Sequence, residues 1–320
     1  MLMMNNIIRS AYRASDSFTD RYNILTICRN NEKYISLLCH LPHDFYIVND
    51  HPWNTLIEAR PDNVYTLAAH SPPLDFILCY DRAEQYSEAQ NFAAHYHIPI
   101  VLVDMCSESL VRPQHIFENL QPQDIRMLHR TPAIRVCGSQ HIQDSWNPDS
   151  IALTIPIGID HDKFKSLRSP EDSLISLDNN TSSEVGAAIS HHLGSKHTIL
   201  PTDHENAEEI TVNKTKYFIN TNTSATVKLL EAMSSQNVVI SLRNADTEDL
   251  IEHSKTGMLI DNMEELSTTV EFLEQNPDEY SRISAAARQY IIANHNLDIF
   301  VQKWSSVLTM MKSNFYLPTA

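Results

Sequence analysis

Glycine is scarce in this chain of 320 residues, which contains only five. The two common glycine-rich phosphate-binding patterns, GxGxxG and GxxxxGK followed by Ser or Thr, do not occur in it. A nucleotide would therefore have to be held without the usual glycine-rich loop. Apolar runs of the roughly 20 residues needed to cross a bilayer are also missing. The opening, residues 1–9, is too short and too soon polar for a secretory signal, so we expect no membrane insertion.

Cysteine and histidine patterns that are typical of metal sites are lacking too. The five cysteines include no CxxC pair, and such an odd, scattered set is typical of a reducing compartment. We therefore expect a cytoplasmic protein, in the host cytoplasm if the protein is viral. The sixteen histidines are scattered, and even the trio His40, His43 and His51 lacks the spacing of a zinc-binding helix. No metal site is predicted.

Positive charge is in deficit, because 24 Lys and Arg face 40 Asp and Glu, for a formal net charge of −16. That charge opposes nonspecific attraction to nucleic acid or to an anionic membrane, although it leaves room for a local basic cleft. The content of 42% hydrophobic and 20% charged residues is that of a globular protein. The length suits one large or two ordinary domains.

Short, nearly continuous apolar runs alternate with amphipathic stretches along the first half of the chain. The runs that we predict as strands are residues 22–28, 44–48, 75–79, 99–103 and 133–137. Helices are predicted at residues 31–41 and 82–96. Continuous apolar strands are typical of a parallel sheet that is covered on both faces. The alternation of strands with helices therefore predicts an α/β fold with a doubly wound sheet.

The second half continues this alternation. Strands are predicted at residues 173–177, 197–200, 216–220 and 238–240, and helices at residues 183–193, 264–274 and 279–294. A last amphipathic helix is predicted at residues 297–311, with Ile299, Phe300, Trp304 and Leu308 largely on one face.

Residues 220–233 carry the most functional information. The segment begins with polar residues of the capping type, turns helical at about Ser224, and leads into the strand 238–240. A helix N-terminus offers free backbone N–H groups and the positive end of the helix dipole, which suit a phosphate. Glu231 lies about two turns inside the helix, where a carboxylate can reach the two hydroxyls of a ribose.

The order of these elements resembles the donor-binding half of family 4 glycosyltransferases, enzymes of the two-domain GT-B fold. In that family a Glu-Ala-Met helix precedes a Val-Val strand, and a Thr-Gly-aliphatic turn follows, as at Glu231, Val238 and Thr256 here. A second match lies upstream, in the connector formed by residues 150–160.

This connector is similar to an Ile-Pro-Asn-Gly-Val-Asp segment that the family commonly carries, with a Phe four residues on. Pro156, Gly158, Asp160 and Phe164 fit that segment, and Ile157 replaces its Asn. Asp160 and Asp162 also have the spelling of an Asp-x-Asp metal motif, but the GT-B fold requires none, and a structural role in the connector is expected.

The resemblance implies two Rossmann-like doubly wound domains that face a central cleft. Residues 1–158 would form an acceptor-binding domain, with the C-terminal helix 297–320 crossing back onto it. Residues 159–296 would form the donor-binding domain. Gly158 would be the hinge for closure of the two domains, because it alone in the connector tolerates unusual backbone angles.

A donor site follows from the same resemblance, with Glu231 as the acceptor of hydrogen bonds from the ribose. The turn before it would face the phosphates and the sugar, and it consists of Thr223, Ser224, Ala225 and Thr226. Thr223 stands where the family has a second Glu that touches the transferred sugar, so a smaller or different sugar is one alternative. A simple N-cap by Ser224 or Thr223 is compatible with phosphate binding.

The basic residues that neutralise the diphosphate in the family have no counterpart at the matching position. The corresponding stretch, residues 173–184, contains no Lys or Arg, although a diphosphate in a dry cleft needs compensating charge. Lys228 and Arg243 are the basic candidates nearest to the proposed site in the sequence. The departure leaves open that the protein is a degenerate relative that binds no donor.

On the acceptor side, Asp104 and His51 are the catalytic candidates. Asp104 follows the strand 99–103, where it could accept a hydrogen bond from a sugar or the incoming hydroxyl, or cap the next helix. His51 lies in a loop with Asp50 and Trp53 that offers a carboxylate, an imidazole and a stacking surface, although Trp53 is alternatively a core aromatic. The sequence shows no arrangement that is typical of an enzyme nucleophile. This fits the resemblance, which implies a retaining transfer that works by positioning and by stabilisation of the leaving diphosphate.

The resemblance thus implies a hexosyl- or pentosyltransferase with a nucleotide diphosphate sugar, expected to be a UDP-sugar, as co-substrate and no tightly bound cofactor. The opening residues and the compact size are similar to glycosyltransferases of tailed phages, some of which modify hydroxymethylated bases, so double-stranded DNA is the first acceptor considered. Its phosphates would contact Arg9, Arg13, Arg21, Arg29 and Arg60. A glycan or lipid-linked saccharide is the alternative acceptor, and a non-catalytic nucleotide- or sugar-binding protein is the alternative of a different class.

Overall fold

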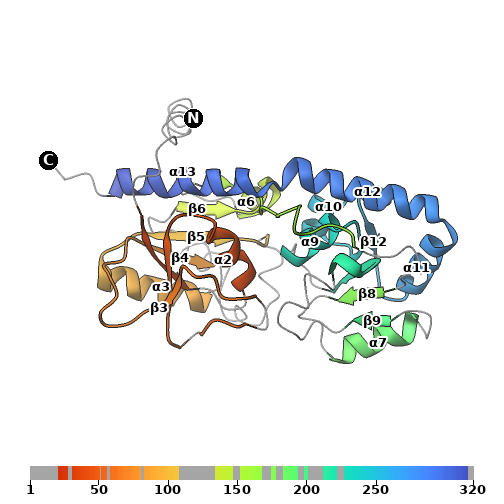
Figure 1. Ribbon diagram of the computed structural model, residues 1–320, viewed down its shortest axis with the longest axis horizontal. Coiled ribbons are helices and arrows are strands. Elements are labelled where there is room, and N and C mark those ends of the chain that lie inside the picture. The colour runs from red at the N-terminus through yellow and green to blue at the C-terminus, as the bar shows by residue number, and fades with distance from the viewer. Residues whose placement is uncertain are drawn as a thin grey trace. The chain divides into compact units, whose positions relative to one another are not determined.

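The computed structural model describes residues 21–27, 31–50, 52–55, 58–80, 83–107, 134–146, 152–167, 174–177, 183–193, 198–200, 212–221 and 227–315. The chain divides into two compact units (Figure 1). The first unit comprises Met1–Gly158 and Leu297–Ala320, and the second comprises Ile159–Asn296.

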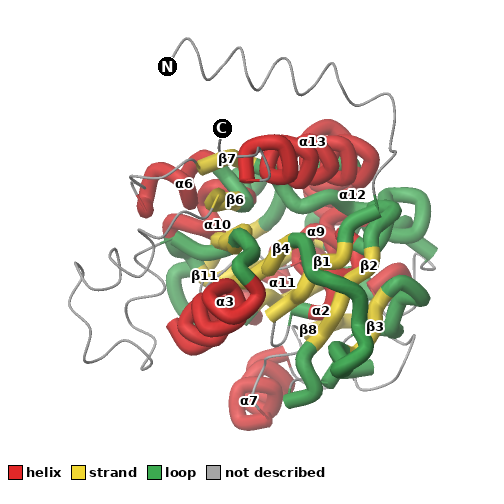
Figure 2. The backbone as a smooth tube through the Cα atoms, turned by 90° about the vertical axis from the view of Figure 1, so that its left-hand side faces the viewer, coloured by secondary structure: helices red, strands yellow, loops and turns green. Residues whose placement is uncertain are grey.

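The first unit is built on a seven-stranded sheet in which all paired neighbours are parallel. Its strands are β1 (Asn23–Ile27), β2 (Asp44–Ile47), β3 (Val64–Thr66), β4 (Phe76–Tyr80), β5 (Ile100–Asp104), β6 (Ile134–Cys137) and β7 (Ala152–Thr154). They lie in the order β3-β2-β1-β4-β5-β6-β7, and Figure 2 shows β4, β1 and β2 side by side. Every residue of β4 and β5 is buried, as expected for central strands covered on both faces.

Four described helices belong to this unit, namely α2 (Glu32–Leu38), α3 (Ala83–Tyr96), α6 (Gln140–Trp146) and α13 (Leu297–Phe315). The helix α3 packs on β4, and its buried Tyr86 and Ala89 join a core with Leu25, Ile77 and Leu102 of three neighbouring strands.

The last helix, α13, packs on α2. Trp304 is 1% exposed, and its Nε1 donates to the hydroxyl of Tyr34 at 3.2 Å. Lys312 pairs with Asp75 at 2.6 Å near the other end of the helix. The prediction for this helix was wrong for Ile299, which is 51% exposed while Phe300 is buried. Neighbouring residues point about 100° apart around a helix, so the two cannot share one face.

Gly158 lies against the beginning of α13. A Cβ atom at this position would lie 2.5 Å from the Cβ of Phe300 and 2.9 Å from the Cα of Leu297. Its φ lies outside the left-handed region. The reason given for this glycine from the sequence, unusual backbone angles, is therefore wrong. Close packing against α13 requires the missing side chain, and a hinge at Gly158 stays a prediction.

The second unit contains a five-stranded parallel sheet in the order β12-β11-β10-β8-β9. Its strands are β8 (Leu174–Leu177), β9 (Thr198–Leu200), β10 (Tyr217–Asn220), β11 (Val238–Leu242) and β12 (Met258–Ile260). Its helices of at least six residues in the described part are α7 (Ser183–Leu193), α9 (Val227–Ser234), α10 (Ala245–Leu250), α11 (Glu265–Gln275) and α12 (Pro277–Asn294). A core of strand residues such as Tyr217, Val238 and Ile240 packs against Leu266 and Ile283 of the last two helices.

The predicted α/β class with doubly wound parallel sheets is confirmed. The short elements β3, β7, β12, α6 and α10 were not predicted, and β7 lies in the segment that was interpreted as a connector. Three-residue strands and one- to two-turn helices are too short to show a hydrophobic period. Among the described residues, no helix combines the length and the apolar character that crossing a bilayer requires.

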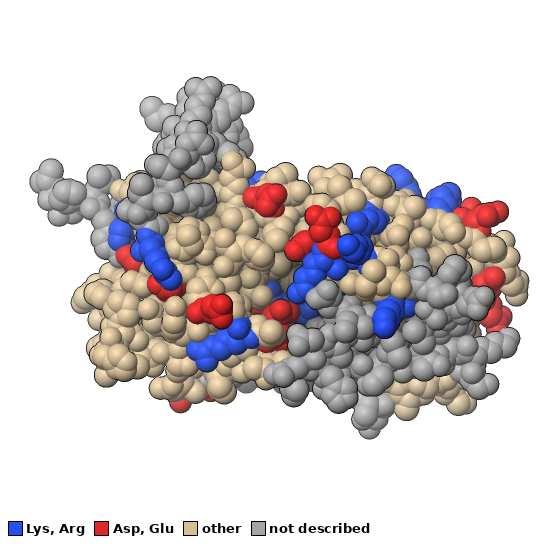
Figure 3. Space-filling view, in the orientation of Figure 1, with Lys and Arg blue, Asp and Glu red and all other residues tan. Residues whose placement is uncertain are grey.

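Several charged side chains of the first unit form ion pairs. Arg21 contacts Asp44 at 2.6 Å, and Lys33 lies 3.6 Å from Glu58. On the face drawn in Figure 3, the blue and red side chains over this unit lie in small adjacent groups rather than in a broad area of one colour.

Candidate functional site

The strand order of the second unit marks where a ligand should bind. In doubly wound sheets, ligands bind beyond the carboxyl ends of the strands, at the point where the strand order reverses. Here that point lies between β8 and β10, because β9 lies on one side of β8 and the other strands lie on the opposite side. The two strands end at Leu177 and Asn220, and α9 follows β10 in the chain.

Two buried charged side chains of α9 lie near this point. Lys228 is 3% exposed, and its Nζ donates to the carbonyl of Leu177 at 2.9 Å. Glu231 is 4% exposed and lies three residues further on, hence on the same face of the helix. Burying charge costs free energy unless it is compensated, and such groups concentrate at functional sites. The helix thus holds a cation at the end of β8 and a carboxylate about one turn beyond it.

The carboxyl ends of β10 and β11 are joined by a buried polar contact. The side-chain amide of Asn220 donates to the hydroxyl of Ser241 at 2.9 Å, and the two residues are paired in the sheet register. Asn220 is 1% exposed and Ser241 is fully buried. This bond fixes the strand end from which the chain leads toward α9.

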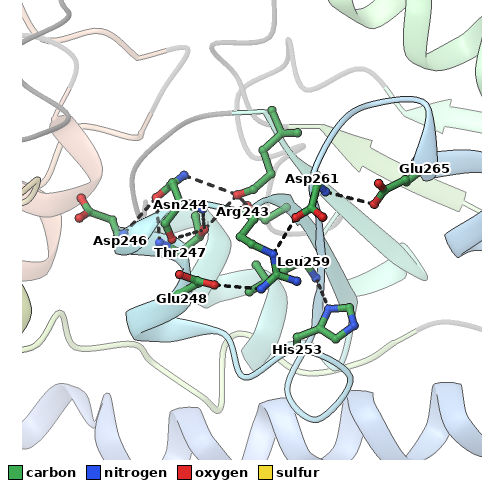
Figure 4. Close-up of polar contacts among 11 residues, drawn as sticks. Arg243, Asn244, Asp246, Thr247, Glu248, His253, Leu259, Asp261 and Glu265 are labelled. Atoms are coloured by element: carbon green, nitrogen blue, oxygen red, sulfur yellow. Dashed lines mark hydrogen bonds and ion pairs between the residues drawn. The ribbon is translucent and has the colours of Figure 1, made fainter.

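Arg243, the second predicted diphosphate cation, lies between two acidic side chains (Figure 4). Its Nε contacts Asp261 at 2.8 Å and its Nη1 contacts Glu248 at 2.9 Å. The guanidinium is therefore offset by two carboxylates, and this arrangement disfavours the prediction that it neutralises a diphosphate.

The loop between these partners is held by its own polar contacts. The side chain of Asn244 caps α10 by accepting from the backbone N–H groups of Asp246 and Thr247 (Figure 4). The turn at the end of β11 thus has hydrogen bonds of its own next to the ion pairs of Arg243.

Several predicted site residues lie outside the described residues. They are His51 on the acceptor side and Thr223, Ser224, Ala225 and Thr226 in the turn before α9.

Asp104, the other predicted catalytic residue, lies inside the first unit. It is the last residue of β5, is fully buried, and pairs with Arg135 of β6 at 2.8 Å between Oδ2 and Nε. The guanidinium of Arg135 also lies 5.3 Å from the ring centre of Trp146. The sequence analysis expected Asp104 to contact substrate or to cap a helix. It did not predict this ion pair with Arg135. Its burial favours a structural role for Asp104 between two strands.

The Asp-x-Asp spelling in the connector corresponds to a turn. The Oδ1 atom of Asp160 accepts from the backbone N–H groups of Asp162 and Lys163 at 3.1 and 3.0 Å. The carboxylate thus stabilises its own loop, as the sequence interpretation expected.

Glu32 is a candidate that the sequence analysis missed. It opens α2, directly beyond the carboxyl end of β1, and is 5% exposed. Its Oε1 accepts from the backbone N–H of Asn54 at 3.3 Å, and its Oε2 has no hydrogen-bond partner within the described part of the chain. Burial raises the pKa of this carboxyl above its ordinary value of 4.5. The feature of the sequence that could have identified Glu32 is its place just after a strand. A buried Glu is otherwise rare.

We expect Glu32→Gln to raise the melting temperature at pH 7. The folded protein binds this proton more tightly than the unfolded chain does, because the folded-state pKa is raised. The contribution of Glu32 to stability is thus fully present below pH 4.5 and falls as the pH rises through the folded-state pKa. Thermal unfolding at pH 7 and near pH 4.5 should show a gain at pH 7 only. Glu58→Gln, which removes the partner of Lys33, is the matched control. A Glu32→Gln variant that is no more stable than wild type at pH 7 would contradict the assignment.

The far end of α9 is anchored by Arg288 of α12. Its Nη1 donates to the carbonyls of Phe164 at 2.9 Å and of Ser234, and its Nη2 donates to the carbonyl of His161 at 3.0 Å. The hydroxyl of Ser234 also donates to Phe164 at 2.8 Å. These bonds tie the last residue of α9 to the segment that opens the second unit. No pattern in the sequence indicates this role, because Ser234 and His161 lie more than 50 residues from Arg288.

One family model matches part of the chain. Residues 205–305 match a model described as glycosyl transferase-like, a range that includes β10, α9 and β11. No curated protein matches the chain in sequence.

Solved structures match nearly the whole chain. HepE from Anabaena in complex with UDP-glucose matches with a TM-score of 0.68 and 13% identity, over 91% of this chain and 100% of its own. Sucrose-phosphate synthase from Thermosynechococcus elongatus gives 0.71 and 9%, over 92% and 100%. A putative UDP-N-acetylglucosamine 2-epimerase from Listeria monocytogenes gives 0.59 and 11%, over 92% and 97%. At these identities the likeness shows the fold alone, which is the GT-B arrangement of two Rossmann-like domains.

Proposed function

We propose that this protein is a glycosyltransferase that takes a sugar from a nucleotide diphosphate and binds that donor on its second unit. The observation that carries the proposal is the pair Lys228 and Glu231 on one face of α9, next to the reversal of strand order and inside the range that matches the family model. In this proposal Glu231 accepts hydrogen bonds from the ribose, and the turn 223–226 faces the phosphates.

UDP is the nucleotide that the comparisons favour. HepE was solved with UDP-glucose and also with UDP, at TM-scores of 0.68 and 0.67 to this chain. Thr223 replaces the family's second Glu, so the transferred sugar itself stays open between glucose and a smaller or different sugar.

We propose a retaining mechanism for the transfer. The second unit would hold the donor so that the bond from the anomeric carbon of the sugar to the diphosphate breaks while the acceptor oxygen bonds to that carbon on the same face. The departing phosphate would accept the proton of the acceptor hydroxyl. The protein would contribute positioning and stabilisation of the negative charge that develops on the leaving group. Determination of the anomeric configuration of the product by NMR tests this step.

A glycan or lipid-linked saccharide is the acceptor that we favour over double-stranded DNA. Of the five arginines expected to bind DNA, Arg21 is paired with Asp44, and Arg60 donates to the carbonyl of Val64 and to Thr66. Arg9, Arg13 and Arg29 lie outside the described residues. The net charge of −16 and the mixed charges on the first unit in Figure 3 also give DNA no support. Duplex binding that falls steeply with salt would restore the DNA acceptor.

A non-catalytic binding protein is the rival from a different class, because the matching strand end lacks the family's basic residues. The epimerase match adds a further activity that this fold carries. Incubation with UDP-glucose and UDP-N-acetylglucosamine, followed by mass spectrometry and NMR, separates the three. Released UDP with a glycosylated acceptor supports the transferase, an altered sugar still bound to UDP indicates an epimerase, and bound but unchanged UDP-sugar indicates a binder.

Glu231→Gln is expected to weaken UDP binding about 10- to 100-fold, since a charge-assisted hydrogen bond contributes about 1.5–3 kcal/mol. Calorimetry on the folded variant measures this. The loss should be smaller for 2′-deoxy-UDP, which lacks one of the two ribose hydroxyls. Glu252→Gln, which removes an exposed carboxylate paired with Lys255 in the same unit, should leave the affinity unchanged. Equal UDP affinity of wild type and Glu231→Gln would contradict the proposal that Glu231 binds the ribose.

A further inference from the structure

We infer that Lys228 is the cation that binds the diphosphate of the donor, in place of basic residues at the end of β8. The inference rests on the proposed function and specifies which residue offsets the negative charge of the diphosphate. A nucleoside diphosphate carries about two negative charges on its phosphates, which must be offset in a buried site.

The location of the ammonium is the first argument. Lys228 reaches from α9 to the carbonyl of Leu177, which is the last residue of β8. It therefore spans the reversal of strand order between β8 and β10, where a ligand of a doubly wound sheet binds. The position supplies a positive charge at the strand end without a Lys or Arg in the strand itself.

The placement of the other basic side chains is the second argument. Most of those described in the second unit have partners elsewhere: Lys216 with Glu274, Arg243 with Asp261 and Glu248, Lys255 with Glu252, Arg282 with Glu279, and Arg288 with three carbonyls. Lys214 precedes β10 and so lies toward the amino ends of the strands, away from the site. Lys163 and Lys165 belong to the segment before β8. Lys228 instead donates from its side chain to the carbonyl of Leu177, the last residue of β8.

The burial of Lys228 is the third argument. Lys228 is 3% exposed as a residue, whereas the side chain of Arg243 is 36% exposed. A buried ammonium lowers stability relative to an apolar side chain unless strong partners compensate it, and a phosphate is such a partner. Charge-assisted bonds are also stronger at a buried site than at an exposed one. A phosphate would add a strong, charge-assisted partner to this buried ammonium.

The test compares Lys228→Met with Arg243→Met, using uridine and UDP as probes in calorimetry and thermal unfolding. Lys228→Met should weaken UDP binding roughly 10- to 100-fold and leave uridine binding unchanged, because uridine has no phosphate. Arg243→Met should leave the affinity for UDP unchanged.

Two results would overturn the inference while leaving the proposed function intact. These are equal UDP affinity of Lys228→Met and wild type, and a parallel loss of uridine and UDP binding, which would show a purely structural lysine. If wild type binds neither UDP nor uridine, the proposed function fails first.

Discussion

Replacing Trp304 by alanine is expected to lower the free energy of unfolding of the first unit by about 3–5 kcal/mol. The indole is 1% exposed and lies edge-on to the rings of Tyr34 and Phe300, with 6.4 Å between ring centres in both pairs. Alanine would leave a cavity and would remove the Nε1–H donor of the Tyr34 hydroxyl. Burial raises the pKa of Tyr34, so that its hydroxyl stays protonated and uncharged in the variant.

Urea unfolding followed by circular dichroism measures this loss. Trp304→Phe is the matched control, since it keeps a large aromatic ring and removes only the donor and part of the volume. It should therefore cost less than alanine. Phe272→Ala, at a side chain that is 45% exposed, should cost little. A loss of under about 1 kcal/mol for Trp304→Ala would show that α13 contributes little to the unit, against the expectation from its packing.

Replacing Arg288 by methionine is expected to destabilise the second unit by about 3 kcal/mol and to weaken UDP binding. The guanidinium donates to the carbonyls of His161, Phe164 and Ser234, and each hydrogen bond from a charged donor contributes about 1.5–3 kcal/mol without full additivity. Because Ser234 ends α9, the loss would also loosen the helix that carries Lys228 and Glu231.

Arg282→Met on the same helix is the matched control for this prediction. Arg282 is exposed, pairs with Glu279 at 2.6 Å and donates to the carbonyl of Ser254 at 2.7 Å. Its loss should therefore destabilise the protein far less than the loss of Arg288 and leave UDP affinity unchanged. Urea unfolding and calorimetry with UDP measure the two effects. Equal effects of the two substitutions would refute the anchoring role, whereas a stable Arg288→Met variant with weak UDP binding would favour a role in positioning over one in stability.

The sequence by itself determined the fold class and the position of the main helix of the site. The runs at β4 and β5 are apolar at consecutive positions, and this local pattern requires burial on both faces, hence a parallel sheet between helices. The segment from β10 through α9 to β11 could also be predicted from the sequence. Its polar start, apolar helix face and Val-Val strand follow one another within about two dozen residues.

Only the tertiary structure decided which residues the charged site candidates contact. Lys228 and Arg243 were equivalent candidates in the sequence, yet one reaches the end of β8 and the other is held by Glu248 and Asp261. Asp104 was a candidate for contact with substrate until its pairing with Arg135 was known.

The physical reason is the range over which each property is set. Helix and strand periods arise from burial along a few consecutive residues, so the sequence records them. The state of a charged side chain depends on partners that strand order and register bring from elsewhere, such as Leu177 for Lys228, 51 residues apart. The same holds for Gly158, whose missing side chain makes room for Phe300 of α13.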